Sequence, residues 1–359
     1  MRFAVAYHQI ISVGGLEGYL MGFIQQMKDR GHEILLVTSQ TDTAARSLGV
    51  PIREVALRRW PKSLRLIRFS SLVERLGPEL EVDLVLGFGR TVSQDVHRAG
   101  GGCHASYSKL LPWHKRWSLK NRMELTLEQL LYTSGRTRHF VVNSKMVAGQ
   151  LSKVYGVAEE RISVIHTPVD SRHFRPPDPR QRRERSVVLF VSSHHRRKGL
   201  DALLAALSAV PDAQLWIAGA PLSLKYRALV GRFALCERVR WLGQVKDLAA
   251  LYRRAAFLVH PTLYDACANT VLQAMASGLP SLVSVADGAS EFIDPGVNGF
   301  LLKYPADFRA LSVALRSALA LSPEEREKMG VAARDRVLPL TWDAHIDAWI
   351  SLCETLRHG

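Results

Sequence analysis

The chain has few cysteines, no long apolar run and none of several common catalytic motifs. Its four cysteines are scattered and form no Cys-x-x-Cys pair, which is typical of small packing residues in a reducing compartment. No run of about 18 apolar residues occurs, so we expect no membrane-spanning helix. Residues 1–15 indicate a strand rather than an export signal. The lack of a G-x-S-x-G elbow and of a Ser-His-Asp pattern argues against a hydrolase.

Acidic residues are scarce relative to basic ones. The chain has 33 aspartates and glutamates against 48 lysines and arginines, for a formal net charge of +15. This excess implies an anionic partner, which charge alone leaves open between a phosphorylated ligand, a membrane surface and a nucleic acid. Because the basic residues recur in one loop and one tryptophan-rich segment, and no known nucleic-acid motif occurs, we expect no nucleic-acid partner.

Short β-rich runs alternate with helical patterns along the chain, which predicts parallel sheets covered on both faces. Strands are expected at Arg2–Tyr7, Glu33–Thr38, Asp83–Gly87 and His139–Val142, and again at Ser186–Val191, Gln214–Ala218, Val239–Leu242 and Phe257–Val259. Between the two series, residues 167–185 contain four prolines and many arginines, as a linker does.

The length of 359 residues exceeds one typical core, so the pattern predicts two doubly wound, Rossmann-like α/β domains facing across a cleft. The N-terminal domain is expected over residues 1–166 and the C-terminal domain over residues 167–341. A last helix, within residues 342–359, has no strand after it and can pack back on the N-terminal domain. Ligand is expected in the cleft.

The stretch from Phe257 to Pro280 predicts a buried strand, a polar loop and a helix that opens near Asn269. The start of such a helix offers free amides and a positive dipole to phosphate. Asp265 in the loop and Gln273 on the helix can bind hydroxyls. An ordinary βα unit without a ligand remains the alternative.

Three adjacent cations, Arg196, Arg197 and Lys198, follow the first strand of the second series. At the carboxyl end of a strand they are well placed to neutralise a diphosphate, although a solvated charge run is the alternative. The neighbouring His194 and His195 lack partners at metal-ligand spacing, so we expect no metal site.

Two glycine-rich turns occur in the first half of the chain. Gly14 and Gly15 precede a helix and leave room for a ligand at its N-terminus, or form a simple turn. Their spacing is not that of the dinucleotide fingerprint. Three glycines before His104 allow close approach of a substrate, and His104 can donate to a sugar hydroxyl or a carbonyl. A structural histidine is the alternative.

The segment from Tyr107 to Tyr132 combines basic and apolar residues. Leu119, Met123, Leu127 and Leu131 recur every four residues and predict an apolar helical face. Such a segment suits the interface of an anionic membrane, or a core helix with a solvated basic face. The expected membrane contacts are Lys109, Trp113, Lys115, Arg116, Trp117, Lys120 and Arg122.

Taken together, these motifs resemble one family, the retaining glycosyltransferases of group 1 (family 4), which have the two-domain GT-B fold. The segments that carry the resemblance, in the family's order, are Val142–Ser144, Arg161–Pro176, Arg197–Gly199, His260–Pro280 and Gly296–Phe300. Within this family the chain is most similar to the bacterial lipopolysaccharide core glucosyltransferases. The Gly14-Gly15 turn, the glycine-rich stretch before His104 and the tryptophan-rich segment suit that membrane-associated branch.

The resemblance implies a role for each motif. Lys198, with Arg197 beside it, would bind the donor's diphosphate, Asp265 would contact the transferred sugar and Gln273 would face the ribose. It implies further donor contacts by Gly14, Gly15, Ala268, Asn269, Thr270 and Val271. His104 would lie near the reacting centre, so that His104, Asp265 and Lys198 are the expected catalytic residues. No metal and no cofactor is expected beside the nucleotide-diphosphate sugar, which is the donor substrate.

Two residues depart from the family pattern. The family's paired glutamates, eight positions apart, are here Asp265 and Gln273, and glutamine lacks the charge that strengthens hydrogen bonds to hydroxyls. The family's usual arginine before the lysine is replaced by Ser193, so Arg196 or Arg197 must substitute for it. These changes bear on donor identity and catalytic rate rather than on the fold.

The resulting hypothesis is a cytoplasmic enzyme, peripheral on the anionic inner-membrane surface. It would move a hexose from a nucleotide sugar such as UDP-glucose to a lipid-linked saccharide such as the lipopolysaccharide core. The expected transfer retains the anomeric configuration and is metal-independent. A catalytically weak nucleotide-sugar-binding protein of the same fold is the alternative, and a nucleic-acid-binding protein is a more distant one.

Overall fold

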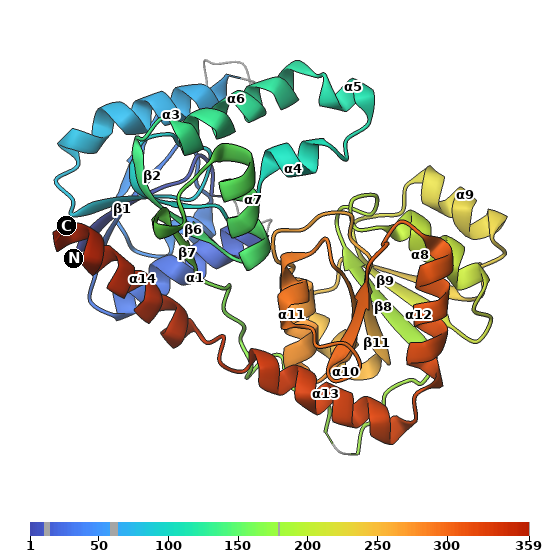
Figure 1. Ribbon diagram of the computed structural model, residues 1–359. Coiled ribbons are helices and arrows are strands. Elements are labelled where there is room, and N and C mark those ends of the chain that lie inside the picture. Colours follow the sequence, from blue (N-terminus) through green and yellow to red (C-terminus); the bar gives the residue numbers. More distant parts are fainter. Residues whose placement is uncertain (11–14, 58–63, 179, 359) are drawn as a thin grey trace. The chain divides into compact units, whose positions relative to one another are not determined.

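The computed structural model describes residues 1–10, 15–57, 64–178 and 180–358, and the chain divides into two compact units (Figure 1). The N-terminal unit comprises residues 1–166 together with residues 342–359, and the C-terminal unit comprises residues 167–341. Each unit contains one parallel sheet with helices on both of its faces, which confirms the predicted fold class of two doubly wound α/β domains.

The sheet of the N-terminal unit has seven strands in the order β3-β2-β1-β4-β5-β6-β7, all parallel. Its strands are β1 (Arg2–Ala6), β2 (Glu33–Thr38), β3 (Ile52–Glu54), β4 (Leu84–Gly87), β5 (Gln94–Arg98), β6 (Thr137–Val142) and β7 (Ile162–Val164). The strand order reverses between β1 and β4. Loops that follow these two strands therefore diverge and leave room at the carboxyl edge of the sheet.

Helices cover both faces of this sheet. They are α1 (Gly15–Asp29), α2 (Thr43–Arg46), α3 (Arg65–Leu76), α4 (His104–Ser108), α5 (Trp113–Arg116), α6 (Leu119–Thr133), α7 (Lys145–Tyr155) and α14 (Trp342–His358), with the short 3-10 turns η1 (Gly77–Glu79) and η2 (Glu159–Arg161). Side chains of β1 alternate between two cores. Phe3 and Val5 pack with α1, whereas Ala4 and Ala6 pack with α3.

Helix α14 belongs to the core of the N-terminal unit although it follows the whole C-terminal unit in the sequence. Its Trp349 is fully buried, with ring centroids 5.1 Å from Phe23 of α1 and 5.8 Å from Phe88 after β4. Two exposed ion pairs join Arg30 at the end of α1 to Asp343 and Asp347 of α14. Apolar burial against α1 therefore fixes α14 to this unit.

The sheet of the C-terminal unit has six parallel strands in the order β10-β9-β8-β11-β12-β13. They are β8 (Val187–Ser192), β9 (Gln214–Gly219), β10 (Val239–Gly243), β11 (Phe257–His260), β12 (Ser281–Ser284) and β13 (Gly299–Leu302). Here the order reverses between β8 and β11. The two loops that leave these strands at their carboxyl ends form the corresponding switch point.

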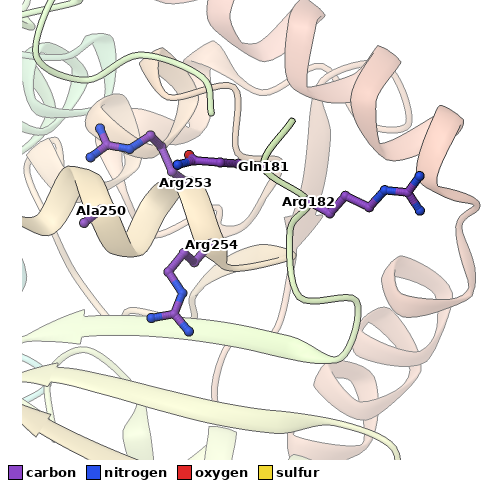
Figure 2. Close-up of a pocket in the computed structure, with 5 residues that line it drawn as sticks. All are labelled: Gln181, Arg182, Ala250, Arg253 and Arg254. Carbon is purple, nitrogen blue, oxygen red and sulfur yellow. The ribbon is translucent and has the colours of Figure 1, made fainter. Parts of the chain in front are cut away.

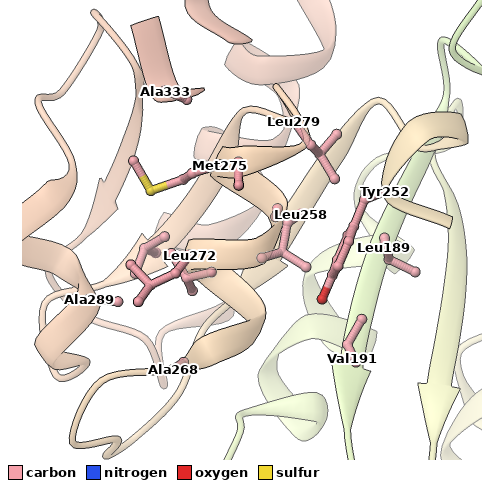
Figure 3. Close-up of a cluster of buried hydrophobic side chains, with 14 of the residues drawn as sticks. Leu189, Val191, Tyr252, Leu258, Ala268, Leu272, Met275, Leu279, Ala289 and Ala333 are labelled. Carbon is pink, nitrogen blue, oxygen red and sulfur yellow. The ribbon is translucent and has the colours of Figure 1, made fainter. Parts of the chain in front are cut away.

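Two apolar cores flank this second sheet. Its helices are α8 (Leu200–Ser208), α9 (Leu224–Arg232), α10 (Leu248–Arg254), α11 (Asn269–Ala276), α12 (Phe308–Ala320) and α13 (Pro323–Val337), with the 3-10 turn η3 (Gly288–Phe292). In one core, shown in Figure 3, Leu272 and Met275 of α11 pack with Leu258 of β11. Since α11 is short, this packing and not helix propensity holds it in place.

Candidate functional site

The first group of site residues lies at the switch point of the C-terminal unit. Arg197 and Lys198 follow β8, and Asp265 follows β11, the strand that pairs with β8 in parallel. Because neighbouring parallel strands end at the same edge of a sheet, the two loops meet there. Arg197 Nη1 lies 3.2 Å from Asp265 Oδ2, and Lys198 Nζ donates to the same oxygen. The structure thus brings together the two halves of the site predicted from the sequence.

The carboxylate of Asp265 is ionised in this cluster. Burial alone would raise its pKa, but the positive charges of Lys198 and Arg197 outweigh burial and hold the pKa of Asp265 below its usual value. Lys198 is itself buried to more than nine-tenths. A cation at this depth, paired with one carboxylate, is poised to exchange that partner for the oxygens of an anionic ligand.

A buried acid and a buried histidine stand behind this cluster. His260, at the end of β11, is fully buried, and its Nε2 lies 3.2 Å from Lys198 Nζ and 3.2 Å from Oδ2 of Asp287. Burial and the neighbouring charge of Lys198 lower the pKa of His260, so the ring is neutral. The imidazole of His260 thus lies within 3.2 Å of both the Lys198 amine and the buried Asp287 carboxylate.

Asp287 also occupies the start of α11. Its Oδ1 accepts from the amide of Ala268 at 3.0 Å and from the amide of Ala289 at 2.8 Å. Within the described part of the chain, the amides of Asn269 and Thr270 have no such acceptor, while the Val271 amide donates to the Ala268 carbonyl. The predicted phosphate-binding turn therefore offers the amides of Asn269 and Thr270, and not that of Ala268.

Gln273 lies on the second turn of α11. Its Oε1 accepts a long hydrogen bond, 3.4 Å, from the hydroxyl of Tyr252, which is fully buried. One acceptor lone pair of the glutamine is thus already directed towards the protein, whereas its amide NH₂ group remains a donor. A glutamate at this position would present two acceptor oxygens, so glutamine here changes the hydrogen-bonding capacity of this side chain.

The loop that carries the two cations is tied tightly to the loop after β11. The hydroxyl of Thr262 and the amide of Leu263 both lie within hydrogen-bond distance of the Arg197 carbonyl, at 3.1 and 2.8 Å. Gly199 has a φ of +81°, and a Cβ at this position would lie 2.0 Å from the Pro261 carbonyl oxygen. Only glycine fits here, which lets the loop that carries Lys198 lie directly against the loop that leads to Asp265.

The remaining predicted site residues lie in the N-terminal unit. Gly14 lies outside the described residues, and Gly15 is the exposed first residue of α1. His104 begins α4, beyond the end of β5. Its ring Nε2 lies 2.8 Å from Asn121 Oδ1 and 3.2 Å from Glu124 Oε2, both on α6. Neither Asn121 nor Glu124 was predicted from the sequence.

Within the tryptophan-rich segment, the predicted membrane contacts from Lys109 to Arg122 lie around α5 and at the start of α6. All seven predicted membrane contacts are exposed, and Trp113, Trp117 and Leu119 expose 78%, 72% and 69% of their surface. Further along α6, Leu127 and Leu131 are buried. The apolar stripe predicted for this helix is therefore divided. Its later part belongs to the core, whereas its first residue and both tryptophans face solvent.

A separate hollow lies near the linker of the C-terminal unit. It is lined by Gln181, Arg182, Ala250, Arg253 and Arg254 (Figure 2). The three guanidinium groups point in different directions, and Arg254 is paired with Glu184 at 2.5 Å. No predicted site residue lines this hollow, so it is distinct from the Lys198–Asp265 site.

Two Rossmann-like units, one of them with a cationic cluster at its switch point, match the two-domain fold expected of GT-B glycosyltransferases. Two family models cover most of the chain: Glycosyltransferase Family 4 over residues 13–173, and Glycosyl transferases group 1 over residues 185–320. The chain belongs to these group 1 and family 4 glycosyltransferases, which confirms the resemblance seen in the sequence.

Two curated relatives match over nearly their whole length. The chain is 23% identical to lipopolysaccharide glucosyltransferase WaaG of Escherichia coli over 341 residues, covering 90% of this chain and 91% of the relative. It is 26% identical to a GDP-mannose-dependent alpha-mannosyltransferase of Mycolicibacterium smegmatis, covering 99% of this chain and 98% of the relative.

Solved structures share the fold. The structure of WaaG, a glycosyltransferase involved in lipopolysaccharide biosynthesis, superposes with a TM-score of 0.80 at 21% identity and covers 99% of this chain and 98% of its own. That of Anabaena HepE in complex with UDP-glucose superposes with a TM-score of 0.74 at 18% identity and covers both chains completely. At these identities the superpositions establish the GT-B fold.

Proposed function

We propose that this glycosyltransferase moves a hexose from a nucleotide-diphosphate sugar, UDP-glucose or a close analogue, to a lipid-linked saccharide such as the lipopolysaccharide core. The observation that carries the proposal is the buried Lys198, paired with Asp265 at the β8–β11 switch point and flanked by Arg197. Such a cluster meets the main chemical demand of the reaction, which is to stabilise the negative charge on the departing diphosphate.

The proposed transfer retains the anomeric configuration. The acceptor hydroxyl oxygen attacks the anomeric carbon from the face that the diphosphate leaves. The bond from that carbon to the phosphate oxygen breaks with its electron pair going to the phosphate, and the hydroxyl proton passes to a phosphate oxygen. Lys198 and Arg197 hold the leaving group together with the amides of Asn269 and Thr270, and these fixed groups need no metal to do so. Asp265 accepts hydrogen bonds from the sugar hydroxyls.

The names of the relatives support this choice of substrates and also indicate which other donors to test. WaaG is named a lipopolysaccharide glucosyltransferase, and HepE is described in complex with UDP-glucose. The mycobacterial relative is named a GDP-mannose-dependent enzyme. We therefore take UDP-glucose as the first donor to test, and guanosine and adenosine diphosphate sugars as its competitors.

The test combines a binding screen with a transfer assay. Thermal shift with uridine, guanosine and adenosine diphosphate sugars selects the donor, because a ligand that binds the folded state raises Tm. The selected sugar, isotopically labelled, is then incubated with a lipopolysaccharide acceptor, and NMR of the product reads the anomeric configuration. Labelled product with retained configuration is expected. Binding without transfer would instead identify a nucleotide-sugar-binding protein. This alternative is suggested by Asp265 and Gln273, which stand where the family has its paired glutamates.

We further propose that the enzyme works in the cytoplasm at the anionic face of the inner membrane. Support comes from the exposed tryptophans and the five exposed basic residues of the Lys109–Arg122 segment. Each basic residue near an anionic surface contributes about 1 kcal/mol, so the segment suffices for reversible attachment. In the described residues, no helix is both long enough and apolar enough to cross a membrane.

Flotation with lipid vesicles tests this attachment. The protein is expected to float with vesicles rich in phosphatidylglycerol and to stay behind with neutral phosphatidylcholine, and added salt should release it. Replacing Trp113 and Trp117 together by serine should weaken the binding severalfold. Replacing Tyr304, an exposed aromatic residue of the C-terminal unit, should not change it. Equal binding to both kinds of vesicle would contradict the electrostatic attachment.

The nucleic-acid alternative has its own test. Retention of labelled RNA on a filter at moderate salt would support it.

A further inference from the structure

The side chain of Asn121 has a fixed orientation. Its Nδ2 donates to the Arg116 carbonyl at 2.9 Å and to Ser108 Oγ at 2.9 Å. A backbone carbonyl only accepts, so the atom that faces it must be the amide nitrogen, and Oδ1 must point the other way. Asn121 is buried, which leaves no room for the opposite assignment to be satisfied by water.

This orientation determines the hydrogen on His104. Oδ1 of Asn121 lies 2.8 Å from His104 Nε2 and can only accept, so Nε2 must carry a hydrogen. Oε2 of Glu124, a second acceptor, lies 3.2 Å from the same nitrogen. In the neutral ring the other nitrogen, Nδ1, then has a bare lone pair, and within the described residues it has no hydrogen-bond partner.

Several charged groups surround His104. Glu124 and Glu128 face it from α6, and the carboxylate of Glu128 also accepts from the amides of His104 and Ala105. Arg90 approaches from the loop after β4, with its guanidinium 3.6 Å from Glu124, and exposed Lys120 lies 4.0 Å from the other Glu124 oxygen. Burial first, and then Arg90, lower the pKa of His104, although Glu124, Asn121 and Glu128 raise it. The ring is therefore neutral at neutral pH.

We propose that Asn121 and Glu124 are positioning residues that hold His104 as the Nε2–H tautomer and present Nδ1 as a hydrogen-bond acceptor. The group that His104 takes is then a hydroxyl of a saccharide, and not a phosphate, a carboxylate or a carbonyl, because only a donor can pair with the bare nitrogen. This inference rests on the proposed function for the identity of the saccharide, and it reverses the donor role considered for His104 from the sequence alone.

Long-range ¹H–¹⁵N NMR on protein labelled in its histidines reads the tautomer directly. The His104 signals are assigned by their absence from the spectrum of His104→Gln. The expected spectrum has a protonated Nε2 and an unprotonated Nδ1 at neutral pH. A protonated Nδ1 with a bare Nε2 would overturn the inference. The measurement needs no substrate, so it decides the polarity of His104 whether or not the protein transfers a sugar.

A pH titration of the same signals tests the positioning residues. Glu124→Gln removes a charge that raises the pKa of His104, so the midpoint should move to lower pH. Arg90→Gln removes a charge that lowers this pKa, so its midpoint should move to higher pH. The matched controls are Glu74→Gln and Arg136→Gln, which break an exposed ion pair of the same unit and should leave the midpoint unchanged. Shifts of the same sign in both test variants would contradict the arrangement.

Inorganic phosphate separates the two kinds of ligand. If Nδ1 bound an anion, added phosphate would stabilise the imidazolium and raise the midpoint of His104. No such rise is expected, and a rise would overturn the assignment to a hydroxyl.

Transfer from UDP-glucose gives the functional readout. His104→Phe should lower kcat/KM about tenfold, the effect of one lost hydrogen bond. His104→Asn, whose Oδ1 can stand where Nδ1 was, should recover part of this loss. Full activity in His104→Phe would show that His104 makes no hydrogen bond to a substrate hydroxyl. Absence of transfer in the unmodified protein would refute the proposed function and, with it, the saccharide as the ligand of His104. The NMR measurement would still decide the tautomer.

Discussion

Lys198→Ala is expected to lower kcat/KM for sugar transfer by about 10²- to 10³-fold, the usual effect of losing one charge-stabilising group in an active site. The physical reason is the loss of the buried cation that would neutralise the departing diphosphate. The fold should persist, because Arg197 still pairs with Asp265 at 3.2 Å and keeps that buried carboxylate compensated. Initial rates with labelled donor measure the loss, and circular dichroism with a thermal melt checks the fold.

The matched control for this substitution is Lys328→Ala. Lys328 is exposed on α13 in the same unit, so its removal changes the net charge equally without touching the site. Its activity should equal that of the unmodified protein. Full activity in Lys198→Ala would show that the diphosphate binds elsewhere. An equal loss in both variants would show that overall charge, and not the position of Lys198, matters.

Gly199→Ala is expected to destabilise the fold strongly. The residue has a φ of +81°, and its new Cβ would lie 2.0 Å from the Pro261 carbonyl oxygen, closer than any real contact. Strain at such a position costs roughly 1–3 kcal/mol before the clash is counted, so the free energy of unfolding should fall by at least this amount. Because Gly199 follows Lys198, transfer should also drop at temperatures where the variant is still folded.

Gly231→Ala provides the comparison. Gly231 lies in α9 of the same unit, and its Cβ would meet nothing within 4 Å. Alanine there should leave the protein unchanged or stabilise it by up to about 1 kcal/mol. Denaturant unfolding of both variants gives the two free energies. Equal values would refute the close fit of Gly199 against the loop after β11.

Strands that contain a run of apolar residues could largely be predicted from the sequence, whereas the polar strand β5 could not. The prediction located β1, β8 and β11 to within one residue but gave no strand at β5. Buried Gln94 of β5 donates to Thr137 Oγ1 at 2.7 Å and to the Thr91 carbonyl at 2.9 Å. Its partner Thr137 lies 43 positions away, so no local pattern distinguishes this buried amide, whose NH₂ group is paired, from an exposed one.

The candidate site shows a similar division. Lys198 and Asp265 could be found separately because each follows an apolar run, where ligand-binding loops occur. Their direct pairing depends on β8 lying beside β11, and this strand order comes from the packing of the whole sheet. Asp287 was missed. An aspartate before a glycine is typical of a turn. Only the tertiary structure shows that the Asp287 carboxylate lies at the start of α11 and beside His260.

The position of α14 has a consequence for how the protein is made. Trp349 lies against Phe23 and Phe88, yet the ribosome must translate the complete C-terminal unit before it reaches this tryptophan. Until then the nascent N-terminal unit carries an uncovered aromatic surface on α1. Domains usually fold in the order of their synthesis, and exposed apolar surface invites aggregation and chaperone binding. Here the first unit to leave the ribosome is the last to close its core.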